Sequence, residues 1–482
     1  MATTWAMAKL TFRLLFRRGG AWLLLGACAG VSGLTFAFCR SDGQLVNEFT
    51  LRSRYALTLG VTLLSLTTLY LACASLRGDL DAKRLHLLTS YPLPRLHIFA
   101  GKWLGLFAVA LLGLGVCLGT VVLCGAWLVH RHPAESERTE WRERVLGVRR
   151  EVSQDLDNLE QRVNAEVELQ LKQARDMGTL PPDRPLADLR REWHDLIWRR
   201  WQLVRPGETI SWRFRLPAPP REATELTVVF RYYCSDKVRP LAGRWGVGSP
   251  GHQHMVVRHT SVHPFTNGEF SVPIDVVPPD GRVWVVFERD HPRELREPIF
   301  HHGTSVRLFY RESSLAGNLA RAAVLLAAHL GVLIAVGLLL ATAFTMTVAA
   351  FNATVLYLVA AAAPFFEQFL RELAEETHFG LMEMMGNVVV RVGLFFATGL
   401  EPPAVIAPLS QGILIDAYHL GMSSTRMVGG GLCQVSALWN EHAPAAARAA
   451  GVDLTLGWVV YAALAAGLGI WLLRRKELDR VH

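Results

Sequence analysis

The sequence predicts a polytopic α-helical membrane protein of about six transmembrane helices, with an inserted extracytoplasmic α+β region that combines a helical hairpin and an antiparallel β-sandwich. Charged residues make up only 19% of the 482 residues, whereas soluble proteins carry about 25%. The shortfall arises from apolar runs of roughly 20 residues, the length that crosses a bilayer. These runs lie on both sides of a long polar segment, in which a helical and then a strand-like periodicity follow each other.

The N-terminal segment KLTFRLLFRRGG carries four basic residues and no acid before the first apolar run begins. Its apolar and basic residues are typical of an amphipathic helix that lies in the headgroup plane, and equally of a basic flank that sets topology. The apolar run that follows is long and lacks a small-x-small cleavage site. We therefore expect an uncleaved first span rather than a signal peptide.

Six apolar runs have the length of a membrane span, and they cover residues 21–39, 55–75, 104–129, 319–341, 345–365 and 454–473. A further apolar stretch at 384–397 is shorter, contains Arg391 and is followed by three prolines. Because broken backbone is not tolerated against lipid, we expect segment 366–450, which includes this stretch, to be re-entrant or interfacial.

Basic residues gather in the N-terminal tail, in the loop between the second and third spans, and in the C-terminal RRKELDR. Because Lys and Arg are enriched in cytoplasmic loops, we expect a multi-pass protein of the cell (inner) membrane with both termini cytoplasmic. The net charge of +8 suits a protein that faces anionic lipid. Nucleic-acid binding is disfavoured, since no basic stripe with interleaved aromatic residues lies outside the membrane flanks.

This orientation places residues 130–316 outside the cytoplasm. Apolar residues recur at steps of three and four over 136–174, which predicts one long amphipathic helix. MGTLPPDRP ends that pattern, and a second stripe at 186–201 completes a helical hairpin over 130–206. Over 207–316, short β-branched and aromatic segments alternate with Gly and Pro clusters, which predicts an antiparallel β-sandwich or jelly roll.

Motifs of nucleotide and hydrolytic chemistry are missing from the sequence. FAGKWLG contains Gly101 and Lys102 but lacks the other residues of a phosphate-binding loop, so we expect no ATPase activity of the chain itself. WGVGSPG matches G-x-G-x-x-G, but Pro250 and strand-like segments follow, so we expect a loop. No G-x-S-x-G occurs. We predict no catalytic residues and no cofactor on this chain.

Two groups of polar residues remain as candidate sites. His252 with His254, or the adjacent histidines at 301–302, have spacings that a metal site uses, but no cysteine or compact carboxylate set accompanies them, so we favour a solvated surface. Within or beside the apolar runs, polar residues are functional candidates by default. These are His329, Asn352, Glu367 and Arg371, of which the last two have the spacing of a local ion pair.

The stretch RGDLDAKRLHLLTSYPLPRLHIFAGKWLG covers residues 77–105, which include nearly all of the loop 76–103 and the start of the third span, and it has a characteristic order of residues. Charged residues come first, paired leucines follow, and then Pro, Arg and Gly-Lys; the singled-out positions are Asp79, Asp81, Lys83, Arg84, Pro92, Arg95, Gly101 and Lys102. This order resembles the corresponding loop of ABC-2-type transporter permeases. The six spans, the N-terminal segment and the final LLRRKEL are also similar to that family. The large external segment departs from its simplest members, which have short external loops.

The resemblance implies that a separate ABC ATPase subunit, with ATP bound to it, contacts this loop, and that a second permease copy or a related permease completes the transporter. The apolar runs and the two periodicities divide the chain into 1–129 with the coupling loop 76–103, then 130–206, 207–316 and 317–482. The lipid bilayer and an extracytoplasmic partner are the other expected partners. An alternative is a membrane-anchored receptor or scaffold whose β domain binds a glycan, lipid or envelope protein.

Overall fold

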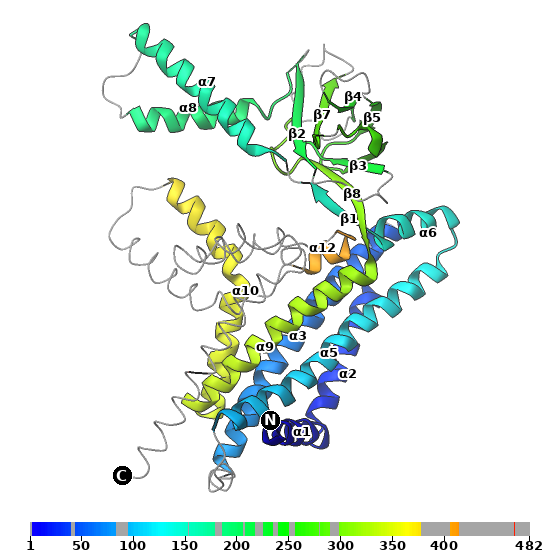
Figure 1. Ribbon diagram of the computed structural model, residues 1–482, viewed down its shortest axis with the longest axis vertical. Coiled ribbons are helices and arrows are strands. Elements are labelled where there is room, and N and C mark those ends of the chain that lie inside the picture. The colour runs from blue at the N-terminus through cyan, green and yellow to red at the C-terminus, as the bar shows by residue number, and fades with distance from the viewer. Residues whose placement is uncertain are drawn as a thin grey trace. The chain divides into compact units, whose positions relative to one another are not determined.

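The chain divides into two compact units, one formed by Met1–Leu146 with Ser314–His482 and the other by Gly147–Ser313 (Figure 1). We call them the helical unit and the β unit. The computed structural model describes residues 2–39, 44–82, 95–152, 154–178, 186–205, 208–216, 225–234, 240–249, 256–278, 280–289, 298–376, 405–413 and 467.

The helical unit contains four helices that are long and apolar enough to cross a membrane: α2 (Gly20–Phe38), α3 (Leu45–Asp81), α5 (Arg95–Arg131) and α9 (Leu315–Ala343). They correspond to the first four predicted spans. The fifth predicted span lies in α10 (Met346–Glu376), whose apolar part, Met346–Ala362, is shorter. Apart from Gly467, the predicted span at 454–473 lies outside the described residues, as does the stretch at 384–397.

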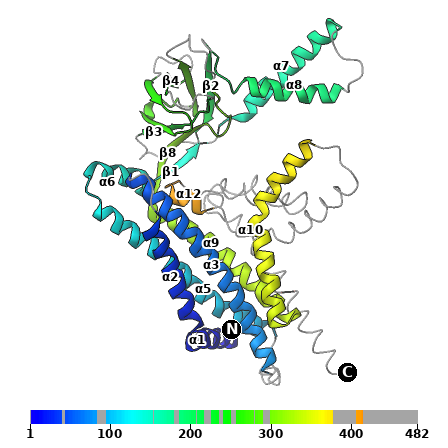
Figure 2. The ribbon, with the colours of Figure 1, turned by 180° about the vertical axis from the view of Figure 1, so that it is seen from behind.

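Helix α3 is central, because it packs against α2, α5, α9 and α10 (Figures 1 and 2). Small residues bring these helices close together, as expected where lipid provides no hydrophobic driving force. A Cβ atom at Gly337 of α9 would lie 2.7 Å from the Cβ of Ala72 in α3. At 37 residues α3 is about 55 Å long, nearly twice the hydrocarbon thickness, so its ends extend past the bilayer core.

The predicted single helix over 136–174 is wrong. The chain there forms α6 (Glu135–Trp141), the π-helical segment η1 (Arg142–Leu146), strand β1 (Gly147–Val152) and α7 (Leu156–Asp176). Val148 and Val152 lie four residues apart, a spacing that shares one face of a helix and equally one face of a strand. The apolar spacing over 136–174 therefore continues through strand β1. For this reason it did not reveal that the chain passes from the helical unit to the β unit between Leu146 and Gly147.

In the β unit, α7 pairs with α8 (Leu186–Arg200), as Figure 1 shows. Their apolar stripes share a small core, and the Trp201 indole N–H donates to Glu166 at 3.0 Å just beyond α8. The core comprises Val163, Val167, Leu171, Leu189 and Ile197.

Two four-stranded antiparallel sheets form the rest of this unit, with the strand orders β1-β8-β3-β6 and β2-β7-β4-β5. The strands are β2 (Thr209–Arg215), β3 (Glu225–Phe230), β4 (Leu241–Gly248), β5 (Val256–Val262), β6 (Gly268–Pro273), β7 (Arg282–Arg289) and β8 (Val306–Ser314). Side chains of both sheets share one core, including Trp245 and Phe287 from one and Phe230 from the other. Gly246 and Gly248, expected in a loop, lie in β4.

Tyr232 closes one end of this core. Its buried hydroxyl donates to the carbonyl oxygen of Val262 at 2.6 Å and accepts from the backbone N–H of Leu241 at 3.0 Å. The residue therefore joins the chain after β3 to the start of β4 and the end of β5.

Replacing Tyr232 with Phe leaves the buried Leu241 N–H and the partly buried Val262 C=O without this partner, which costs about 1–3 kcal/mol of unfolding free energy. We expect hydrogen exchange in β4 and β5 of the full chain to accelerate accordingly. Tyr233→Phe is the matched control, because the neighbouring Tyr233 is engaged through its ring and not by such a bridge. Unchanged exchange in Tyr232→Phe contradicts the assigned role.

Candidate functional site

One lysine joins the two helices that flank residues 83–94. The Nζ atom of Lys102, near the start of α5, lies 2.5 Å from a carboxylate oxygen of Asp79 near the end of α3. The same ammonium donates to the carbonyl oxygen of Ser75 at 2.8 Å and lies 3.4 Å from its hydroxyl. The Lys102 side chain is only 3% exposed.

The local geometry explains why one lysine reaches both residues. Ser75 and Asp79 are four residues apart and therefore lie on one face of α3. An ammonium group has three N–H donors, and here a carboxylate and a carbonyl accept from it. Because an unpaired charge in this position is costly, we expect the ends of α3 and α5 to stay together. We call Ser75, Asp79 and Lys102 the lysine clamp.

Helix α1 (Ala2–Arg17) docks on the same part of α5. A Cβ atom at Gly101 would lie 2.5 Å from the Cβ of Met7, and one at Gly105 would lie 2.7 Å from the carbonyl oxygen of Ala8. Only glycine permits this approach. The two glycines have the G-x-x-x-G spacing that lets membrane helices pack backbone to backbone. Figures 1 and 2 show α1 at the lower end of the helical unit.

The opposite face of α1 is free of this contact. Trp5 and Leu10 are exposed there, and so are the basic residues Lys9 and Arg13. Exposed apolar side chains next to basic ones are the pattern of a helix that lies in the headgroup plane. The interfacial interpretation of the N-terminal segment is therefore favoured, with the addition that α1 is fixed to α5.

Trp103 adds a third connection. Its indole N–H donates to the carbonyl oxygen of Gly331 in the middle of α9 at 2.8 Å, and its ring stacks on Phe107 at a centroid distance of 4.9 Å. Successive residues of a helix point about 100° apart. Gly101, Lys102 and Trp103 accordingly contact α1, α3 and α9 in turn, and we call this arrangement the three-helix junction.

The other loop candidates are not part of the clamp. Asp81 is largely exposed and pairs with Arg77 one turn earlier on α3 at 2.9 Å. Arg95 begins α5, but its side chain lies outside the described residues. Lys83, Arg84 and Pro92 also fall outside them.

The intramembrane candidates are distributed over two helices. His329 is fully buried in α9. Asn352 is half-buried on α10. Glu367 and Arg371 lie one turn apart on α10, and their side chains are outside the described residues. We assign these four residues no role.

The histidines of the β unit have aromatic and polar neighbours. The Nδ1 atom of His301 lies 3.1 Å from the side-chain oxygen of Gln202, and His302 packs edge-on against Trp198. Burial lowers the pKa of His302 to about 4, so this side chain is neutral at neutral pH. Within the described ranges, no group of three or more His, Cys, Asp or Glu side chains is arranged to hold a metal ion. His252 and His254 lie outside those ranges.

Sequence reasoning missed Ser75, Gly105 and the Trp103–Gly331 hydrogen bond. A usable signal existed for Gly105, because AGKWLG contains G-x-x-x-G at the start of an apolar run. Comparison with protein-family models, with curated proteins and with solved structures found no match to this chain.

Replacing Lys102 with Met removes the ammonium that pairs with the Asp79 carboxylate, and we expect a loss of about 3 kcal/mol in unfolding free energy. Asp79→Leu should cost a similar amount of unfolding free energy, since it removes the carboxylate that pairs with the buried Lys102 ammonium. The double variant should recover most of the loss, because neither charge remains. Denaturant unfolding of the solubilised chain measures all three.

The Arg77–Asp81 ion pair is the control for these variants, since it lies at the same helix end and its Asp81 side chain is 56% exposed. Surface pairs are worth about 0.2–1 kcal/mol, so Arg77→Met should have a small effect. Additive losses in the Lys102 and Asp79 double variant contradict the clamp.

Proposed function

We propose that this chain is the membrane-spanning permease subunit of an ABC-2-type transporter. In this proposal a separate subunit hydrolyses ATP, and the permease couples that reaction to movement of a substrate across the membrane. The observation that carries the proposal is the lysine clamp, which fixes to each other the two helices on either side of residues 83–94. These residues belong to the loop that resembles the family's coupling loop.

A coupling loop has to transmit movement to the helices that hold it. If α3 and α5 separated easily at the loop, a push on the loop would spread them and would be lost locally. The paired Lys102 and Asp79 oppose that separation. The hydrogen bond from Trp103 to Gly331 extends the connection to α9. A push on the loop is therefore expected to move three apolar helices together.

The loop residues have distinct roles in this proposal. Lys83, Arg84 and Arg95 supply cationic groups for carboxylates of the ATPase subunit, and charge-assisted pairs of this kind are short and strong. Pro92 restricts the backbone, which keeps the contact surface in one conformation. The chain contributes no nucleotide site of its own, in line with the missing G-x-x-x-x-G-K-[ST] pattern in its sequence.

The proposal includes six spans, cytoplasmic termini and a location in the cell (inner) membrane. A second copy of the chain or a related permease would complete the translocation path. The β unit, with its large shared core, would lie outside the cytoplasm as a rigid docking domain for an extracytoplasmic partner. Helix α1 would lie at the cytoplasmic surface, where its basic residues contact anionic headgroups.

The direct test is purification of the chain from its native membranes, followed by mass spectrometry and an ATP hydrolysis assay. We expect an ATPase subunit to co-purify in stoichiometric amount. Arg84→Glu or Arg95→Glu places like charges across the contact, which costs several kcal/mol, so recovery should fall at least about tenfold. Arg191→Glu, at an exposed position of α8 in the β unit, is the matched control and should retain the ATPase subunit.

Two results contradict the proposal: absence of an ATPase subunit from the wild-type preparation, or equal recovery in the loop reversals and the control. A receptor or scaffold instead predicts that the loop reversals and the control recover the same partner, which is not an ATPase subunit. That partner is lost when the β unit is removed and not when the loop is changed. The same preparations therefore separate the two functions.

A further inference from the structure

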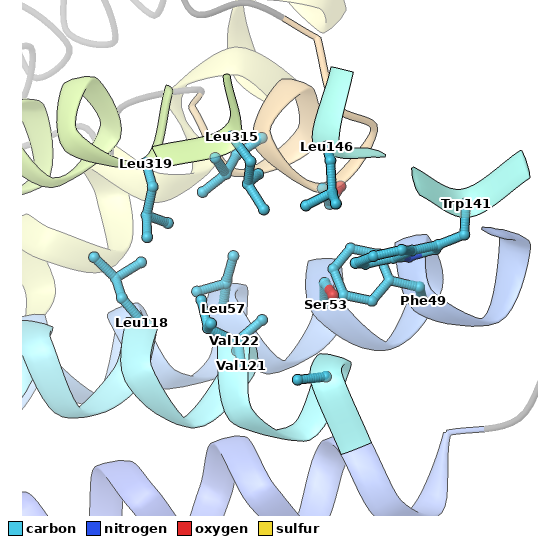
Figure 3. A pocket seen from close by; sticks show the side chains of 13 residues that line it. Phe49, Ser53, Leu57, Leu118, Val121, Val122, Trp141, Leu146, Leu315 and Leu319 are labelled. Carbon is cyan, nitrogen blue, oxygen red and sulfur yellow. The ribbon is translucent and has the colours of Figure 1, made fainter. Parts of the chain in front are cut away.

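The helical unit contains an apolar cavity of about 200 Å³ between α3, α5, α9 and the short helix α12 (Ile406–Ser410) (Figure 3). Its body is lined by aliphatic side chains, among them Leu57, Leu118, Val121 and Leu319. An engineered apolar cavity of about 150 Å³ stays dry and takes up benzene. This cavity therefore has room for several methylene groups and offers no site for water along its body.

Two buried residues that carry a polar group line one end of the cavity. Figure 3 shows Ser53 of α3 and Trp141 of α6 on the same side, next to Phe49. Ser53 is 2% exposed and Trp141 is 8% exposed. Neither the Ser53 hydroxyl nor the Trp141 indole nitrogen has a hydrogen-bond partner among the residues that the structure describes. An unpaired buried polar group costs about 1–3 kcal/mol, so two of them at one end point to an acceptor that binds there.

The cavity also has an opening. Val122 is 44% exposed, and Ala126, one turn further along α5, is exposed as well, although both line the cavity. The exposed face of an apolar span faces lipid, so the opening faces the bilayer. Ser53 lies just before the apolar run that begins at residue 55, which corresponds to the boundary between headgroups and acyl chains.

These observations favour one class of occupant. A peptide segment would bring backbone N–H groups, which need acceptors that an apolar cavity does not supply. A phospholipid acyl chain brings methylene groups for the body, and its ester carbonyl is an acceptor located at the same boundary level as Ser53. Trp N–H is a donor only, and a serine hydroxyl can donate, so both groups match a carbonyl oxygen.

We propose that this cavity binds one acyl chain of a membrane phospholipid. The acyl chain enters past Val122 and Ala126 and packs against Leu57, Leu118 and Leu319. The Ser53 hydroxyl and the Trp141 indole N–H donate to its ester carbonyl oxygen. The site is independent of the loop between α3 and α5, so it stands whether or not an ATPase subunit binds there.

The test uses the full chain in phosphatidylcholine vesicles that contain a small fraction of phosphatidylcholine with a diazirine on its acyl chain. After irradiation, mass spectrometry locates the adducts. We expect them to concentrate on the cavity-lining parts of α5 and α9. Ala126→Trp places an indole in the opening and should reduce this labelling at least about tenfold. Leu123→Trp adds the same bulk to a lipid-facing position of α5 that is 72% exposed and does not line the cavity, and it should leave labelling unchanged.

The polar end is tested by Ser53→Ala combined with Trp141→Phe. Each hydrogen bond contributes about 0.5–1.5 kcal/mol, so the double variant should lower occupancy about tenfold while Ala126 and its surroundings stay intact. If Ala126→Trp does not fold, Val122→Phe narrows the same opening and gives the same comparison.

Three outcomes overturn the proposal. One is labelling spread evenly over all exposed helix faces, which indicates surrounding bilayer lipid only. The second is undiminished cavity labelling in Ala126→Trp. The third is labelling of the cavity by a photoactivatable free fatty acid and not by the phospholipid, which assigns the site to another amphiphile.

Discussion

The buried ion pair between Lys102 and Asp79 constrains the helical unit more than any other contact described above. A charge within packed helices has to be paired, and here the ammonium also takes the Ser75 carbonyl as an acceptor. Separation of α3 from α5 would break this ion pair and the hydrogen bond to Ser75. The pair therefore holds the end of α3 and the start of α5 together as one rigid body. Residues 83–94 are connected to this rigid body at both ends.

The neighbours of Lys102 extend this constraint. Gly101 and Gly105 admit the backbone of α1, and Trp103 reaches a carbonyl of α9. Gly101, Lys102 and Trp103 thus contact three different helices, because successive residues of a helix point about 100° apart. Gly101, Lys102 and Trp103 in AGKWLG therefore form the three-helix junction. The same residues had suggested an incomplete phosphate-binding loop in the sequence, and the burial of Lys102 explains why a lysine stands there without one.

The sequence predicted well what the bilayer dictates. Apolar length located α2, α3, α5 and α9, because lipid requires continuous helices with internally paired backbones. Alternating apolar residues located most strands of the two sheets. The sequence-based prediction failed where two periods coincide. Val148 and Val152 fit a helix and a strand alike, and only the pairing of β1 with β8 in the folded chain decides between them. Ser75 and the Trp103–Gly331 bond carry no sequence signal, because a serine and a backbone carbonyl acquire their roles from tertiary contacts.

The central claim is that α1, the end of α3 and the start of α5 form one rigid body. Spin labels at Lys9 of α1 and Gly78 of α3 test it directly, in a background without the native cysteines, because Lys9 is exposed and a side chain at Gly78 meets no atom within 4 Å. Electron-electron double resonance should give a single narrow distance distribution for the otherwise unchanged chain, and a broad one once Asp79→Asn weakens the lysine clamp. A broad distribution in the unchanged chain, or an equally narrow one in Asp79→Asn, would contradict the account.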